Sequence, residues 1–345
     1  MTHEFHSSVL REYDIRGVVG DTLNIDDARA VGRAFATVVK RAGGSRIAVG
    51  RDGRLTSEEF QDSVIEGVTS CGIDVVDVGL GPTPMTYYSV FELDLDGGIM
   101  VTGSHNPSNY NGFKMMLGKK AFHGKQIQNL GALAKVADFE TGEGRREQRD
   151  MRQDYIERML KDFTGTDLSV AWDPGNGAAA EIITRLVKYL PGRHIVINGD
   201  VDGRFPNHHP DPTEEKNLEQ LKAVVVENTM DLGIAFDGDG DRIGAVDSTG
   251  HVVWGDQLLA MLARDVLADQ PGSTIIADVK ASQALFDEVK RLGGEPLMWK
   301  TGHSLIKSKM VESGAPLAGE MSGHIFFSHR FYGFDDAVYA AIRLL

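Results

Sequence analysis

The chain has 345 residues, a formal net charge of -14 at pH 7 and 41% hydrophobic residues. This length exceeds one typical compact core and predicts two or three domains. The negative charge excludes a nucleic-acid backbone or an anionic membrane surface as an expected partner, because like charges repel. Anionic small molecules remain compatible with the sequence wherever basic residues converge.

Cysteine usage and hydropathy indicate the compartment. Cys71 is the single cysteine, so no internal disulfide can form, and the first 14 residues lack the apolar core of a secretion signal. No apolar stretch approaches the roughly 20 residues that cross a bilayer. We therefore expect a cytoplasmic protein without a membrane span.

Strand-like and helix-like segments alternate along the chain. The alternation of short β-branched runs with longer helical periodicity is typical of α/β folds. Strands are predicted at 46–50, 73–79, 97–101, 168–172, 194–198, 232–236 and 273–279, and helices at 26–42, 57–71, 177–190, 214–228, 256–269 and 281–292.

Local signals mark element ends and domain boundaries. Thr56 and Glu59 have the spacing of a capping box, and Gly43-Gly44 predicts a helix stop. The polar run at 140–153 is interpreted as a linker, and a second boundary is predicted near 250. The pattern of a strand followed by an Asp/Gly loop recurs in "IAVGRDGR", "VAWDPGNG" and "GIAFDGDGDR", which suggests a repeated unit.

The segment "FDGDGDR" places Asp237, Asp239 and Asp241 in alternation with glycines after a predicted strand. Three carboxylates turned toward one point favour a hard cation, and Mg²⁺ suits oxygen ligands. An EF-hand is rejected because Arg242 and Ser248 occupy the positions that need glycine and glutamate. A solvated acidic turn is the alternative. Three carboxylates leave coordination positions open, and phosphate oxygen commonly fills these on magnesium.

The segment "TGSHNP" follows the apolar run "GGIMV". Gly103 and Asn106-Pro107 predict a tight turn from which Ser104 projects, as a nucleophile or a phosphoryl carrier. Local hydrogen bonding is the alternative for this serine, and His105 taken alone favours a structural role.

Three further segments carry candidate anion or sugar contacts. "REYDIRG" contains Arg11 and Arg16, and would otherwise be an exposed edge. "KTGHS" at 300–304 precedes a predicted helix, so Lys300 and the helix start suit an anion, with a capped helix as the alternative. In "GEMSGH" at 319–324, Glu320 and Ser322 suit sugar hydroxyls, with a structural hydrogen-bond bridge as the alternative.

These five motifs, in this order, resemble the α-D-phosphohexomutases, and the bacterial phosphomannomutase/phosphoglucomutase group in particular. The resemblance runs from about residue 10 to the last residue. It implies three consecutive α/β domains with mixed sheets sandwiched by helices, at 1–148, 149–250 and 251–345, with the active site in a central cleft. It also implies that Ser104 is a phosphoserine which, with Asp237, Asp239 and Asp241, holds one Mg²⁺ per chain. The reaction-centre positions would be Tyr13, Arg16, His105, Lys114, Arg242 and His303, and the substrate-binding positions Lys300, Glu320, Ser322 and His324.

The implied reaction moves phosphate between O1 and O6 of a hexose through a 1,6-bisphosphate, and glucose 1,6-bisphosphate or an equivalent would phosphorylate Ser104. Lys114, Arg16 and His303 are the candidates for moving the hydroxyl proton, although arginine seldom offers a neutral form. "GEMSGH" resembles the loop of enzymes that accept mannose and glucose. Family members carry a fourth domain whose loop binds the non-reacting phosphate, and that loop is missing from this sequence. We therefore expect a chain that folds as a monomer and carries phosphate on Ser104, but turns over poorly.

Two other functions remain open from the sequence. A non-catalytic sugar-phosphate sensor would bind hexose phosphate without exchanging phosphate with Ser104. A magnesium-dependent phosphatase would use an aspartate nucleophile, since "DGDGD" superficially resembles such sites.

Overall fold

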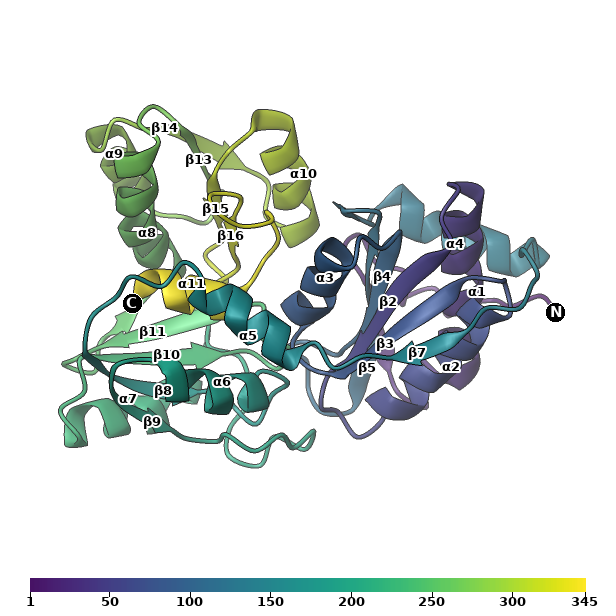
Figure 1. Cartoon of the computed structure of the whole chain (residues 1–345), viewed down its shortest axis with the longest axis horizontal. Helices are drawn as coiled ribbons and strands as arrows, with labels where there is room; N and C mark the ends of the chain where they lie inside the picture. The colour runs from purple at the N-terminus through teal and green to yellow at the C-terminus, as the bar shows by residue number, and fades with distance from the viewer. The chain divides into compact units, whose positions relative to one another are not determined.

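The computed structural model describes all 345 residues, and its internal contacts divide the chain into two compact units (Figure 1). Unit 1 comprises residues 1–152 and 202–204, and unit 2 comprises residues 153–201 and 205–345. Unit 1 contains one sheet and unit 2 contains two, so the α/β fold expected from the sequence is confirmed. No helix is long and apolar enough to cross a membrane.

Unit 1 is built on a seven-stranded mixed sheet of order β1-β5-β4-β2-β3-β7, with β6 paired to β5. The strands are β1 (Ile15–Val18), β2 (Arg46–Arg51), β3 (Asp74–Leu80), β4 (Gly97–Val101), β5 (Tyr110–Leu117), β6 (Lys120–Ala121) and β7 (Arg146–Gln148). The helices are α1 (Ile25–Arg41), α2 (Ser57–Thr69), α3 (Thr83–Glu92) and α4 (Lys125–Val136).

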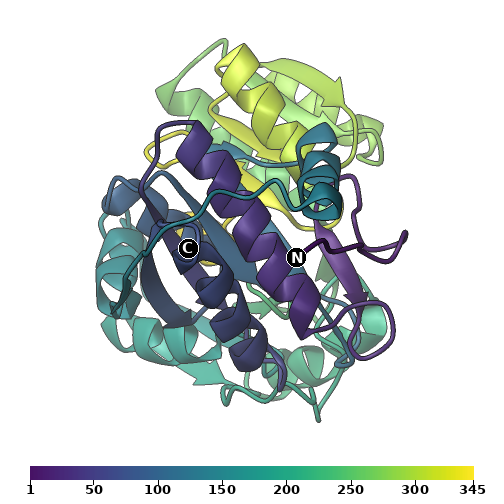
Figure 2. The same cartoon turned by 90° about the vertical axis from the view of Figure 1, so that its right-hand side faces the viewer.

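Alternation along β2 divides the helices of unit 1 between two faces of the sheet. Ile47 and Val49 belong to a core cluster with residues of α1, α2 and α4. Gly50 faces α3, where a Cβ would lie 2.1 Å from Thr86 Oγ1. Helices α1 and α2 pack closely side by side, and Figure 2 shows α1 in purple in front of the sheet. The sheet is therefore sandwiched, as the resemblance implied.

Unit 2 contains two sheets. The first has the order β12-β11-β10-β8-β9, from β8 (Leu168–Asp173), β9 (Gly192–Val196), β10 (Leu232–Phe236), β11 (Ile243–Asp247) and β12 (Val252–Val253). The second has the order β14-β13-β15-β16, from β13 (Thr274–Asp278), β14 (Glu295–Trp299), β15 (Leu317–Gly319) and β16 (Ile325–Phe327).

The α-helices of unit 2 are α5 (Arg152–Leu160), α6 (Ala180–Leu186), α7 (Glu219–Glu227), α8 (Gly255–Asp269), α9 (Gln283–Arg291), α10 (His303–Ser313) and α11 (Ala337–Leu344). Short 3₁₀ turns at Val187–Tyr189 and Glu215–Leu218 complete two of the helical segments predicted from the sequence. On the first sheet, buried Trp172 of β8 stacks on Phe236 of β10, with the ring centroids 6.3 Å apart and the planes 3° from parallel.

One local prediction is wrong, and a second is incomplete. Thr56 makes no side-chain capping bond to α2, because its hydroxyl accepts a hydrogen bond from Asn111 Nδ2 at 3.0 Å instead. The linker predicted at 140–153 includes the end of unit 1 at residue 152, but it also contains β7, whose exposed residues pair in parallel with β3. The stop at Gly43 is confirmed, since this residue has φ +88° just after α1.

Candidate functional site

The serine predicted as a phosphoryl carrier lies in the loop between β4 and β5 of unit 1. Ser104 is 2% exposed and has φ +49°, a left-handed conformation that is uncommon for a residue with a Cβ. Its backbone N–H donates to Thr102 Oγ1 at 2.7 Å, and its Oγ lies 3.1 Å from His105 Nδ1. The loop therefore holds the serine in one defined conformation.

Two buried arginines hold this loop. Arg16 on β1 donates from Nη1 to the carbonyl of Gly103 and also to Asn106 Oδ1, the latter at 3.1 Å. Its Nη2 pairs with Asp14. Arg54 donates to the carbonyls of Ser104 and Asn106, at 2.7 and 2.6 Å, among others. Arg16 was predicted from the sequence, whereas Arg54 was not. The available signal was "GRDGR", which places Arg54 in the loop three residues after the end of β2.

Two other candidates, Tyr13 and Lys114, also belong to unit 1. Tyr13 is half-buried just before β1, and Lys114 is buried on β5 in register with Met100 of β4. In the serine loop, Ser104 contacts His105, and Arg16 contacts the neighbouring residues Gly103 and Asn106.

The acidic candidates of unit 2 lie in the hairpin loop between β10 and β11. Asp237, Asp239 and Asp241 are all fully buried, and one carboxylate oxygen from each lies within 4.8 Å of the others. Asp237 Oδ1 also accepts hydrogen bonds from the backbone N–H groups of Asp241 and Arg242, both at 3.1 Å. Buried like charges require compensation, and an oxygen-only donor set fits Mg²⁺. The residues present therefore fit the expected cation.

Backbone contacts fix this acidic loop from two sides. Ala178 N–H donates to the carbonyl of Gly238 at 2.9 Å, and Gly238 N–H donates to the carbonyl of Pro210 at 3.1 Å. Asp173, at the end of β8, holds the two segments that flank the acidic loop. It accepts from Gly175 N–H at 2.9 Å in one segment and contacts His208 Nε2 at 2.9 Å in the other. Burial lowers the pKa of His208, but the Asp173 carboxylate outweighs it and raises that pKa.

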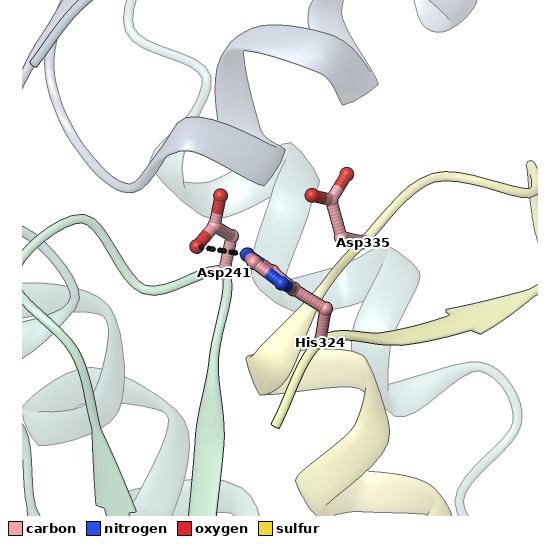
Figure 3. Close-up of side chains that lie close together, drawn as sticks. All are labelled: Asp241, His324 and Asp335. Carbon is pink, nitrogen blue, oxygen red and sulfur yellow. Dashed lines mark ion pairs between the residues drawn. The ribbon is translucent and has the colours of Figure 1, made fainter. Parts of the chain in front are cut away.

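His324 connects the acidic loop to the predicted sugar loop. Its Nε2 lies 3.3 Å from Asp241 Oδ1 (Figure 3), and its Nδ1 lies 2.8 Å from Glu320 Oε2. Burial lowers the pKa of His324, but the surrounding carboxylates raise it to about 9. Arg242 Nε also lies 3.3 Å from the same Nε2.

Glu320 forms a protein-internal bridge. It is buried, and its Oε1 accepts from Gly302 N–H, the N-cap of α10, at 2.5 Å. Burial raises the pKa of Glu320, but His324 and the Gly302 N–H lower it overall. The start of α10 in "KTGHS" is thus bound by an anion of the chain itself, the Glu320 carboxylate. Lys300, in the same segment, is exposed. Ser322 Oγ lies 3.2 Å from His324 Nδ1.

A second buried ion pair lies beside His324. Lys307 of α10 pairs with Asp335 at 2.7 Å, and His303, one turn earlier, has its Nδ1 3.4 Å from the other Asp335 oxygen. Burial and the Lys307 charge lower the pKa of His303. Asp335, His324 and Asp241 lie close together (Figure 3), with one ligand atom of each within 4.8 Å of the others. Lys307 and Asp335 were not predicted from the sequence, and only Lys307 had a signal, its i, i+4 spacing from His303.

Three α/β sheets, a serine turn after a buried strand and an acidic cation loop define the chain as an α-D-phosphohexomutase by class. Its residues 7–139, 153–250 and 254–345 match α/β/α domains I, II and III of the phosphoglucomutase/phosphomannomutase family. The chain belongs to this family.

Relatives and solved structures agree with this assignment. The chain is 47% identical to a phosphomannomutase/phosphoglucomutase of Pseudomonas aeruginosa PAO1 over 340 residues, which cover 98% of this chain and 73% of that protein. It is 44% identical to a phosphoglucomutase of Neisseria meningitidis Z2491, over 98% of this chain and 74% of that one. A crystal structure of a family protein from Burkholderia thailandensis has a TM-score of 0.96 at 47% identity and covers 98% of this chain and 76% of its own.

A more distant similarity shows the fold alone. An N-acetylphosphoglucosamine mutase of Aspergillus fumigatus, solved with GlcNAc-6P and magnesium, has a TM-score of 0.60 at 14% identity. It covers 96% of this chain and 76% of its own.

Proposed function

We propose that the chain interconverts hexose 1-phosphate and hexose 6-phosphate through a phosphoserine at Ser104. The observation that carries this proposal is the buried, left-handed Ser104 at the carboxyl end of β4, in a loop held by two buried guanidinium groups. Ligands gather at the carboxyl ends of strands in open α/β sheets. Family membership supports the same role.

In the proposed reaction, the bond between Ser104 Oγ and phosphorus breaks as a bond from phosphorus to the sugar O1 or O6 forms, and the hydroxyl proton leaves. The 1,6-bisphosphate then returns its other phosphoryl group to Ser104 Oγ. A Mg²⁺ held by Asp237, Asp239 and Asp241 would neutralise charge on the transferring group. The buried, oxygen-only donor set supports this cation, and the fold relative from A. fumigatus was solved with magnesium.

Among the three candidates for moving the proton, His303 has the best support. Its lowered pKa keeps it neutral at pH 7, as a general base requires. Arg16 is engaged with Gly103, Asn106 and Asp14, and arginine stays charged. Lys114 remains a candidate through its burial on β5.

Hexose phosphates are the proposed substrates, with mannose and glucose as the sugars. The names of the Pseudomonas and Neisseria relatives support this class. Glu320 and Ser322 would bind sugar hydroxyls, which requires Glu320 to exchange its bond with Gly302 or His324 for one with the sugar. We also propose that the three domains end at residues 148, 250 and 345.

Mass spectrometry of the intact chain tests the function. After incubation with glucose 1,6-bisphosphate and Mg²⁺, one added phosphate should appear and should be absent in Ser104→Ala. If this phosphoryl group carries ¹⁸O, mixing the chain with an excess of unlabelled glucose 1-phosphate should replace it with an unlabelled one. Binding of hexose phosphate without any exchange would instead indicate a sensor, and an acid-labile phosphate that persists in Ser104→Ala would indicate an aspartyl phosphatase.

A further inference from the structure

Arg54 makes an unusual set of contacts with the serine loop. The side chain is fully buried, and its Nη1 donates to the carbonyls of Pro107 and Tyr110, at 2.5 and 3.1 Å. Its Nη2 donates to Ser104 and Asn106, at 2.7 and 2.6 Å. Four backbone carbonyls from one loop therefore converge on a single guanidinium.

Asp52 completes the arrangement. Its Oδ2 lies 3.1 Å from Arg54 Nε and accepts hydrogen bonds from Thr102 Oγ1 at 2.8 Å and Gly103 N–H at 3.0 Å. Asp52 thus binds the start of the loop, and Arg54 binds the rest of it. The five N–H donors of a guanidinium are matched by the four carbonyls and this carboxylate.

The packing leaves no room for another side chain in this arrangement. A Cβ added to Gly103 would lie 2.2 Å from both Cζ and Nε of Arg54. Ser104, the next residue, is held at φ +49°, a conformation that is unfavourable for a residue with a Cβ and persists only when the surroundings impose it. Arg54 contacts the Ser104 carbonyl, while the Oγ contacts His105.

We infer that Arg54, oriented by Asp52, is the positioning residue that fixes the backbone of Ser104 and thereby the direction of its Oγ. This inference rests on the proposed role of Ser104 as phosphoryl carrier. A lysine cannot replace Arg54, because an ammonium is a point charge and cannot reach four carbonyls in one plane. Arg54 does not act on the substrate itself.

The test measures the rate at which the 345-residue chain takes up phosphate from glucose 1,6-bisphosphate, by mass spectrometry over a range of bisphosphate concentrations. Misplacement of a reacting group by about 1 Å reduces rates by roughly 100-fold. We expect this loss in the maximal uptake rate of Arg54→Lys, with the half-saturating concentration unchanged. Arg54→Ala should be slow as well, and added guanidinium, but not urea, should restore part of its rate.

Arg343→Lys is the matched control. Arg343 has a side chain that is 5% exposed, a bond to the carbonyl of His329 at 3.2 Å and a carboxylate partner, Asp265, at 2.5 Å, but it lies on α11. Its uptake rate should stay within about threefold of the unsubstituted chain, because no reacting group is displaced.

The outcomes distinguish the positioning role of Arg54 from the proposed function of Ser104. Uptake by a folded Arg54→Lys at the unsubstituted rate overturns the positioning role. If Arg54→Lys does not fold, Asp52→Asn decides, since it keeps the arginine and neutralises the carboxylate that orients it and binds the start of the loop; an unchanged rate there overturns the inference. No uptake by the unsubstituted chain would instead refute the proposed function.

Discussion

Tyr155 Oη lies 2.9 Å from each carboxylate oxygen of Asp336, and both residues are buried in unit 2. Tyr155 belongs to α5, and Asp336 is the N-cap of α11, where it also accepts from Tyr339 N–H at 2.9 Å. Burial raises the pKa of Asp336 to about 7, although these hydrogen bonds favour the charged form. Two helices distant in sequence are therefore joined at a carboxyl group that binds its proton unusually tightly.

The first prediction concerns pH. The folded pKa of Asp336 lies above its unfolded value of 3.8, so between these values the folded chain keeps a proton that the unfolded chain has lost. The contribution of Asp336 to stability is therefore largest below pH 4 and falls by up to about 1.4 kcal/mol per pH unit as the pH rises toward 7. Asp336→Asn should remove this slope and increase the free energy of unfolding at pH 7.

Urea denaturation at several pH values between 5 and 8 measures the effect. Asp26→Asn, at a side chain that is 75% exposed, serves as the control and should keep the original slope. A slope in Asp336→Asn equal to that of the unsubstituted chain would contradict the assigned pKa.

The second prediction concerns the buried pair of Lys307 and Asp335. Removing one partner of a buried ion pair destabilises by about 3–5 kcal/mol, because the other charge stays uncompensated. Lys307→Met should therefore lower the free energy of unfolding by several kcal/mol, and adding Asp335→Asn should recover part of the loss. Lys309→Met, on the same helix with the exposed partner Glu312, should change stability by about 1 kcal/mol or less. Thermal unfolding of all four proteins tests the difference, and equal losses for the two lysines would refute it.

The third prediction concerns the acidic loop. Asp239→Asn removes one of three adjacent carboxylates, so the metal-free protein should become more stable while Mg²⁺ binding is lost. For the unsubstituted chain, Mg²⁺ at about 100 times its dissociation constant should add about 2.7 kcal/mol. Melting curves with and without Mg²⁺ check this, with Asp247→Asn as a control that should keep the response. A stabilisation by Mg²⁺ that survives Asp239→Asn would place the cation elsewhere.

The fourth prediction concerns the contact of α1 with α2. A Cβ on Gly32 would lie 2.3 Å from the carbonyl oxygen of Val64, which is backbone and cannot move aside. Gly32→Ala should destabilise the chain by about 1–3 kcal/mol. Gly131→Ala in α4 is the matched control, since its close contact would be with the end of the flexible Leu10 side chain, with Phe5 Cδ2 at 3.9 Å, and we expect it to be neutral or stabilising by up to about 1 kcal/mol. Chemical denaturation compares the two, and a neutral Gly32→Ala would contradict the packing argument.

The sequence was sufficient for features that depend on neighbouring residues. The buried strand Leu232–Phe236 and the acidic loop after it were predicted because the apolar run and the Asp/Gly alternation are both local. Features that depend on distant partners were missed. Arg54 binds carbonyls about 50 residues away, Thr56 is diverted by Asn111, and β7 forms only because the edge of β3 is available. Glu320 was identified, but its bond to Gly302 follows from the pairing of β15 with β13 and the start of α10.

The stacking of Trp172 on Phe236 gives the protein an intrinsic optical probe. Phe236 directly precedes Asp237, and the Trp172 indole is fully buried, with its Nε1–H donating to His194 at 3.2 Å. A shift of the acidic loop changes the surroundings of this indole. In a chain whose other two tryptophans, Trp254 and Trp299, are replaced by phenylalanine, the emission of Trp172 would follow cation binding without any added label.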